Sequence, residues 1–451
     1  MKLTALTLAR ELVDARRPLL PILAVVSFAA ATWVALAAAG GLHMFLARAH
    51  EPQSSLDPRL VVEGTDVRET YAFLAALACV LVVPAVVALS ANAAVAGASG
   101  REERLAVLRL LGITSWEANR VALWGTMAEA GAGIVLGTAL SALSAPLWSA
   151  LSFQYRPIGA TEMYLPLLWC VLLWVALLAV TALAAVWGLL RVSISPLGVV
   201  RRQPTRRVGV WRLILFIAAF GAAYLAIRAM GRGSEAASGV VVWALVAVVL
   251  ASLSLAMGFV LQLVATLLAA IPLLPPSVHT ALARIAAQPV RTWNRVATTG
   301  FLCVVLGAVT TLPVPDDPAS ASGVLDKVLM DIRTGAYVTI GLSFLLFAVS
   351  TVLTQSARVV EQRELDRALV RMGVSRGFLF RVALTEVLLP LLLAMAAGVG
   401  VGRLLFSAAA QPGGTGVVWP VLAAGTALVV GAVGAAELVR GRGRVSPAPT
   451  A

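Results

Sequence analysis

The 451-residue chain has few residues of the kinds that build metal or disulfide centres. It contains only three cysteines and three histidines, and none of the histidines has a cysteine or carboxylate at metal-ligand spacing. Cys79, Cys170 and Cys303 all lie inside apolar runs, where cysteine is typical of a small buried hydrophobic side chain. The pattern therefore predicts neither a disulfide framework nor a metal site.

Lysine is rarer still, because Lys2 and Lys327 are the only two. A P-loop cradles nucleotide phosphates with Gly-x-x-x-x-Gly-Lys-Ser/Thr, and neither lysine follows a glycine. The chain therefore cannot hold ATP in that way. We expect a protein without a catalytic residue or a bound cofactor of its own.

Charged residues make up only 13% of the chain, whereas 60% of the residues are hydrophobic. This composition is typical of integral membrane proteins. The net charge of +13 comes from short basic clusters beside apolar runs. Such clusters fit orientation in a membrane and contact with anionic lipid head groups, and they argue against nucleic-acid binding.

Ten apolar runs are long enough to cross a bilayer core of about 30 Å, which takes about 20 residues. Their approximate limits are 19–46, 71–94, 121–145, 164–190, 210–228, 239–268, 295–313, 337–355, 382–404 and 417–439. Pro84, Pro166 and Pro390 lie within these runs and are expected to kink their helices. The sequence predicts an all-α integral membrane protein with about ten transmembrane helices.

Lysine and arginine set the expected orientation. With the N-terminus inside, the cytoplasmic segments hold 26 of the 35 basic residues. Both termini are therefore predicted to be cytoplasmic. The two longest external segments, 47–70 and 314–336, are too short to support a core of their own, so we expect no large extracytoplasmic domain.

A charged segment occurs twice, each time just before an apolar run. The copies cover 101–114 and 362–375, and Gly112 aligns with Gly373. The same alignment pairs Glu103 with Glu364, Leu108 with Leu369, Thr114 with Ser375, and Arg120 with Arg381. Two matching segments suggest two docking elements for a pair of soluble partners. The alternative is that both are simply solvated, positively charged loops.

The repeat divides the chain into two similar units. An amphipathic helix over 1–18 leads into a first four-helix unit over 19–200, a two-helix insert covers 201–275, and a second four-helix unit covers 276–447. Because the insert contains an even number of spans, the two units are expected to be parallel. The competing explanation is that Ala/Leu/Val-rich helices resemble one another by composition alone.

At these residues the chain resembles the FtsX-like (MacB-type) permease family of ABC transporters. The second copy matches the family pattern at Glu364, Arg371, Gly373, Ser375, Arg381 and Glu386. The first copy matches at Glu103, Arg109, Gly112 and Thr114, but Gly125 stands at the position of Glu386 and Glu129 follows one helical turn later. Many members carry a large extracytoplasmic domain, which this chain lacks by the reasoning above.

The resemblance implies a dimeric ABC ATPase on the cytoplasmic face, two copies per chain, which would hold the Mg-ATP. The glycines permit a tight or left-handed turn, and Thr114 and Ser375 can cap the next helix. The side chains expected at the docking surface are Arg109, Leu110, Leu111, Arg371, Met372 and Arg376. Membrane lipids, and a sensor kinase or accessory protein, are further candidate partners.

Glu129 and Glu386 are the conspicuous carboxylates at membrane depth. Each should face protein or water, because a charge in the bilayer is costly. One interpretation is an internal hydrogen bond to backbone or to a hydroxyl, and the other is contact with a substrate or proton.

Three functions remain open from the sequence. The first is a bacterial cell-membrane ABC permease that exports or extracts a lipophilic or amphipathic substrate, such as an antimicrobial peptide, drug or lipid. The second is a non-transporting subunit that carries a signal across the membrane. The third is a secondary transporter, although its repeats would more often be inverted.

Overall fold

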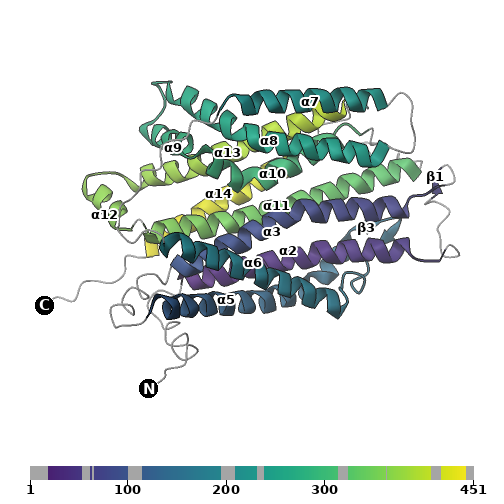
Figure 1. The fold of residues 1–451 in the computed structure, drawn as a ribbon, viewed down its shortest axis with the longest axis horizontal. Helices are drawn as coiled ribbons and strands as arrows, with labels where there is room; N and C mark the ends of the chain where they lie inside the picture. Colours follow the sequence, from purple (N-terminus) through teal and green to yellow (C-terminus); the bar gives the residue numbers. More distant parts are fainter. Residues whose placement is uncertain are drawn as a thin grey trace, which may run out of the picture.

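The computed structural model describes residues 19–52, 61–62, 65–99, 114–193, 209–230, 238–312, 324–361, 363–407 and 418–442. Ten long helices make up most of these ranges (Figure 1). They are α2 (Leu19–Ala49), α3 (Arg68–Ser99), α5 (Ser115–Ser144), α6 (Leu167–Ser193), α7 (Trp211–Met230), α8 (Ser238–Ala269), α10 (Pro289–Val309), α11 (Val324–Glu361), α13 (Arg376–Phe406) and α14 (Val418–Arg442). The amphipathic helix predicted for 1–18 lies outside the described residues.

The shorter elements lie between these helices. They are the 3-10 helix η3 (Ala145–Ala150), the helices α9 (Pro276–Ala287) and α12 (Arg363–Arg371), and the antiparallel pairs β1 (Val61–Val62) with β2 (Thr65–Asp66) and β3 (Ser152–Phe153) with β4 (Arg156–Pro157). Within the described ranges, strand structure is confined to these two small hairpins. The fold is that of a multi-pass, all-α membrane protein.

Each of the ten predicted runs coincides with a long helix, but only nine of these helices are apolar enough to count as spans by length and composition. The exception is α10, which corresponds to the run 295–313. It carries Arg291, Asn294 and Arg295 in its first two turns, which lowers its mean hydropathy. The prediction of ten spans is therefore corrected to nine apolar helices plus α10. Most of α10 is nevertheless buried among other helices.

Two further boundaries differ from expectation. The helix α11 begins at Val324, so part of the predicted external loop 314–336 is helical. This first part is too polar to extend an apolar run, yet Lys327 and Asp331 form an ion pair one turn apart that fits a helix. Pro166 precedes α6 and so cannot kink it, whereas Pro84 and Pro390 do lie inside α3 and α13.

The long helices form two sets of four with the same neighbour relations. In the first set, α2 packs against α3 and α5, and α3 packs against α6. In the second set, α10 packs against α11 and α13, and α11 packs against α14. The sets meet where α3 contacts α11, and α7 and α8 flank the second set on the side away from α5 and α6 (Figure 1).

In both sets the third helix meets the first at backbone contact through a pair of glycines four residues apart. In α5 these are Gly133 and Gly137; a Cβ atom at Gly137 would lie 2.5 Å from the carbonyl oxygen of Ala29 in α2. In α13 they are Gly398 and Gly402, which face backbone atoms of α10. Small residues at this spacing let membrane helices approach closely.

The two ends of the bundle differ. The hairpins β1–β2 and β3–β4 lie at one end, which we call the hairpin end. The helices α9 and α12 lie at the other, which we call the α12 end (Figure 1). Because successive spans alternate in direction, α5 and α13 both begin at the α12 end.

Candidate functional site

Two capped helix starts lie at the α12 end. Thr114 precedes α5, where its hydroxyl oxygen accepts from the Glu117 backbone N–H at 3.3 Å while the Glu117 carboxylate accepts from the Thr114 N–H at 3.1 Å. This capping box also lowers the pKa of Glu117, because the Thr114 hydroxyl and N–H both stabilise the carboxylate. Ser375 precedes α13 and accepts from the Phe378 N–H at 3.2 Å. Both predicted caps are confirmed.

The turn between α12 and α13 is the left-handed one expected at a glycine. Gly373 has φ +94°, a conformation that a residue with a Cβ atom adopts only at a cost. The Val374 N–H donates to the carbonyl of Leu369 at 3.0 Å, which closes the end of α12. The corresponding segment of the first copy, with Glu103, Arg109, Leu110, Leu111 and Gly112, lies outside the described residues.

Apolar side chains project from this turn. Met372 is 72% exposed and Leu365, on α12, is 54% exposed. Arg371 and Arg376 are exposed beside them. The backbone of Glu364 belongs to α12, but its side chain is not described. Exposed apolar groups with a basic rim form a surface suited to contact with another protein.

A charge cluster lies beneath this surface and joins four helices. Glu386 of α13 is 9% exposed, and its Oε1 accepts from Arg358 Nη1 of α11 at 2.6 Å. Arg295 of α10 and Arg284 of α9 also pair with this carboxylate, at 3.8 and 3.6 Å. The partners of Glu386 are therefore arginines, where the sequence had suggested backbone, a hydroxyl or a transported ligand. The cluster ties α9, α10, α11 and α13 together at the α12 end.

Glu129 is the other intramembrane acid and belongs to the first set of helices. It lies on α5 against α3, where a Cβ atom at Gly97 would be 2.5 Å from its Oε2. This hypothetical Cβ atom would also lie 3.9 Å from the Cβ atom of Ala24 in α2. Glu129 therefore lies where α5 meets α3 and α2.

An apolar cavity of about 350 Å³ lies between the two sets, in the half of the bundle toward the hairpin end. Its walls come mainly from α2, α3, α10 and α11, with residues such as Leu42, Cys79, Val305 and Ala336. The segment that carries η3 and the β3–β4 hairpin also lines it. Among the described residues that line it, Asp331 alone is charged.

The sequence did not reveal this cavity or the arginines around Glu386. A cavity is lined by the same apolar residue types as any helix contact, so no pattern marks it. The sequence did place charged residues inside or next to apolar runs, as with Asp331, Arg295 and Arg358. Such residues need polar partners, and this was the pattern that could have indicated them.

Comparisons with known proteins do not assign a function to the chain, so the proposal must rest on its geometry. No protein-family model matches the chain, and no curated protein matches it either. Among the described residues, no group of three or more His, Cys, Asp or Glu side chains is arranged as a metal site. The features that remain for a function are therefore the surface at the α12 end, the charge cluster and the cavity.

Proposed function

We propose that the chain is the permease subunit of an FtsX-like ABC transporter in a bacterial cell membrane. A separate ATPase would dock at the α12 end, which would then face the cytoplasm, and its ATP hydrolysis would drive export or extraction of a lipophilic or amphipathic molecule. The observation that carries this proposal is the pair of capped starts of α5 and α13 at the same end, one of them preceded by a surface helix with exposed apolar side chains.

The structure around the second docking segment suits the transmission of a push. The turn at Gly373 leads directly into α13, and the Glu386 cluster holds α13 to α9, α10 and α11. The glycine contacts of Gly398 and Gly402 fix α13 to α10 further along. A displacement at α12 would therefore move these helices as a body, because packed interfaces transmit strain instead of absorbing it.

We further propose that the two sets are parallel duplicated units, 19–200 and 276–447, separated by the insert 201–275. The same pattern of helix–helix contacts in both sets and their matching glycine pairs support this. Two units would present two docking segments, and so would engage two ATPase copies. That arrangement favours an ABC permease over a secondary transporter, whose repeats would more often be inverted.

The cavity favours transport over pure signalling. Its volume lies at the lower end of the range of small-molecule sites, which is about 300–1,000 Å³. It lies between the sets, so that their approach would reduce its volume and expel an apolar occupant. A signalling subunit would need no such space.

The docking surface is tested with the matched pair Met372→Asp and Leu273→Asp. Both side chains are apolar and exposed at the α12 end, with Leu273 92% exposed in the turn before α9. The binding partner in this test is a P-loop ATPase encoded next to the chain. We expect Met372→Asp to reduce its co-purification at least about tenfold, because a buried unpaired charge in an interface costs several kcal/mol. Leu273→Asp should leave it unchanged.

Other outcomes would separate the alternatives. Equal binding by both variants, or no ATPase partner at all, would contradict the docking surface and favour a secondary transporter. Normal ATPase assembly without stimulation of ATP turnover by any amphipathic compound would favour the signalling subunit. Bulky replacements of Gly112 and Gly373 should also impair assembly.

A further inference from the structure

The carboxylate of Asp331 lies at the hairpin-end edge of the cavity, on α11. It is 3% exposed, and every other lining residue within the described part of the chain is uncharged. A buried carboxylate is costly unless it is paired and hydrogen-bonded, so its partners show what chemistry this position accepts.

The two oxygens of Asp331 have different partners. Oδ2 accepts from the Tyr71 hydroxyl of α3 at 2.8 Å and from the Gln154 backbone N–H at 2.9 Å. Oδ1 faces the ammonium group of Lys327, one turn earlier on α11, at 2.8 Å. The first oxygen is thus held by neutral groups of the fold, and the second is paired with a cation.

The ammonium group of Lys327 lies where another cation can take its place beside Asp331. Its side chain is 22% exposed, and its ammonium group also lies 5.9 Å from the centre of the Tyr155 ring. An aromatic face next to a carboxylate stabilises any cation placed between them. Exchange of Lys327 for another ammonium group would leave the charge at Asp331 balanced.

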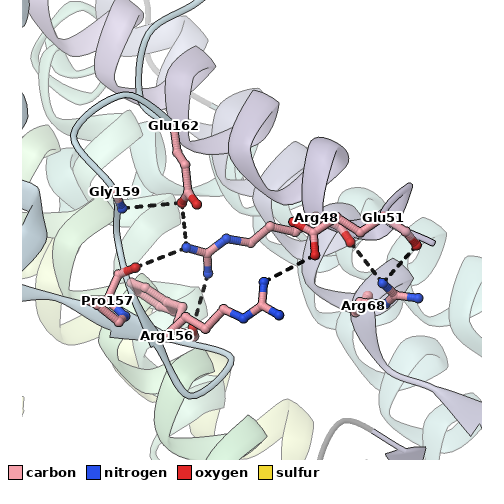
Figure 2. Close-up of polar contacts among 8 residues, drawn as sticks. Arg48, Glu51, Arg68, Arg156, Pro157, Gly159 and Glu162 are labelled. Carbon is pink, nitrogen blue, oxygen red and sulfur yellow. Dashed lines mark hydrogen bonds and ion pairs between the residues drawn. The ribbon is translucent and has the colours of Figure 1, made fainter. Parts of the chain in front are cut away.

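The hairpin that carries Gln154 and Tyr155 is firmly anchored. Arg48 of α2, 3% exposed, donates to the carbonyls of Phe153 and Pro157, both at 3.2 Å, and pairs with Glu162 at 2.5 Å (Figure 2). Arg48 thus holds the backbone on both sides of Gln154 and Tyr155 through bonds that do not involve Lys327. The site is therefore built in advance of any ligand.

We propose that Asp331 selects the substrate of the cavity, and that this substrate is an amphipathic molecule with an apolar body and a primary ammonium head. The apolar body fills the space between α2, α3, α10 and α11, and the head replaces Lys327 on Oδ1 and against Tyr155. This inference rests on the proposed transport function and adds the chemical class of the substrate.

The probe is radiolabelled dodecylamine, with dodecanol and dodecanoate as chain-matched controls. The full chain is placed in phosphatidylcholine nanodiscs, and partitioning into empty nanodiscs is subtracted. We expect saturable binding of dodecylamine at least about tenfold tighter than that of either control, because only the ammonium forms a charge-assisted bond. Binding of all three probes with equal affinity would overturn the proposal.

Two variants sharpen the test. Asp331→Asn should weaken dodecylamine binding about tenfold or more, whereas Asp326→Asn, on the same helix but outside the cavity wall, should not change it. Lys327→Gln should tighten binding of dodecylamine, because it removes the ammonium group that competes for Asp331 and keeps the carboxylate. Unchanged binding in Lys327→Gln would contradict the proposal even if Asp331→Asn failed to fold.

The assay needs no ATPase, so its failure can be told apart from failure of the proposed function. If dodecanol binds as tightly as dodecylamine and the ATPase still assembles, the headgroup selection is wrong and the permease assignment stands. If no probe binds saturably, the use of the cavity for transport fails as well.

Discussion

Glu386→Gln is expected to lower the free energy of unfolding of the chain by about 3 kcal/mol. The change leaves Arg284, Arg295 and Arg358 around a neutral group, so that like charges face one another without the anion that holds them together. We take the low end of the range for broken buried pairs because the three arginines are 31–51% exposed and water screens part of the repulsion. Denaturant unfolding of the purified chain in mild detergent measures the effect.

Glu69→Gln is the matched control, since Glu69 is an exposed carboxylate at the hairpin end. It should change the free energy of unfolding by less than about 0.5 kcal/mol. The double variant Glu386→Gln, Arg358→Met should be more stable than the sum of its single changes predicts, because it removes one of the unpaired cations together with the anion. Equal stability of Glu386→Gln and Glu69→Gln would show that the cluster does not hold the four helices together.

The helices themselves could be predicted because their signal is local. An apolar run of sufficient length specifies a membrane helix wherever its neighbours are. Thr114 and Ser375 likewise act on N–H groups three residues away, and Gly373 acts on its own backbone. These features were therefore visible in the sequence before any packing was known.

The pairing of charges was not predictable in the same way. Glu386 lies 28 residues from Arg358, and the other two arginines come from α9 and α10. Nothing in their spacing along the chain says which basic residue of a cluster reaches which carboxylate. The same applies to Asp331, because its segment looked like an external loop until the helix α11 placed it next to Tyr71 of α3.

The count of spans also differed from the prediction, because the run 295–313 was counted as a span although its helix is polar at its start. The helix α10 is too polar in its first turns to meet the hydropathy of a span, yet Trp293, Leu302 and Leu306 are buried among other helices. A helix surrounded by protein need not be apolar toward lipid along its whole length, since its polar groups find partners inside the bundle. For α10 one of these partners is Glu386.

Gly402→Leu is expected to be the most disruptive single change at a helix contact, lowering the free energy of unfolding by about 3 kcal/mol or more. A Cβ atom at Gly402 would collide with the backbone of Val304 and lie 2.9 Å from the Ala308 nitrogen, and backbone atoms inside a helix cannot move aside cheaply. Gly400→Leu is the internal control, because a Cβ atom at Gly400 meets nothing within 4 Å. The measurement is the thermal unfolding midpoint together with the yield of monodisperse protein.

The first set of helices offers the same experiment independently. Gly137 of α5 faces the backbone of α2, whereas a Cβ atom at Gly131 meets nothing within 4 Å. If the sets are duplicated units, Gly137→Leu should be destabilising and Gly131→Leu neutral, as for Gly402 and Gly400 in the second set. Tolerance of Gly402→Leu would mean that α13 and α10 are not in rigid contact. In the proposed mechanism, the Glu386 cluster would then be the remaining described link that carries a displacement of α12 from α13 to α10.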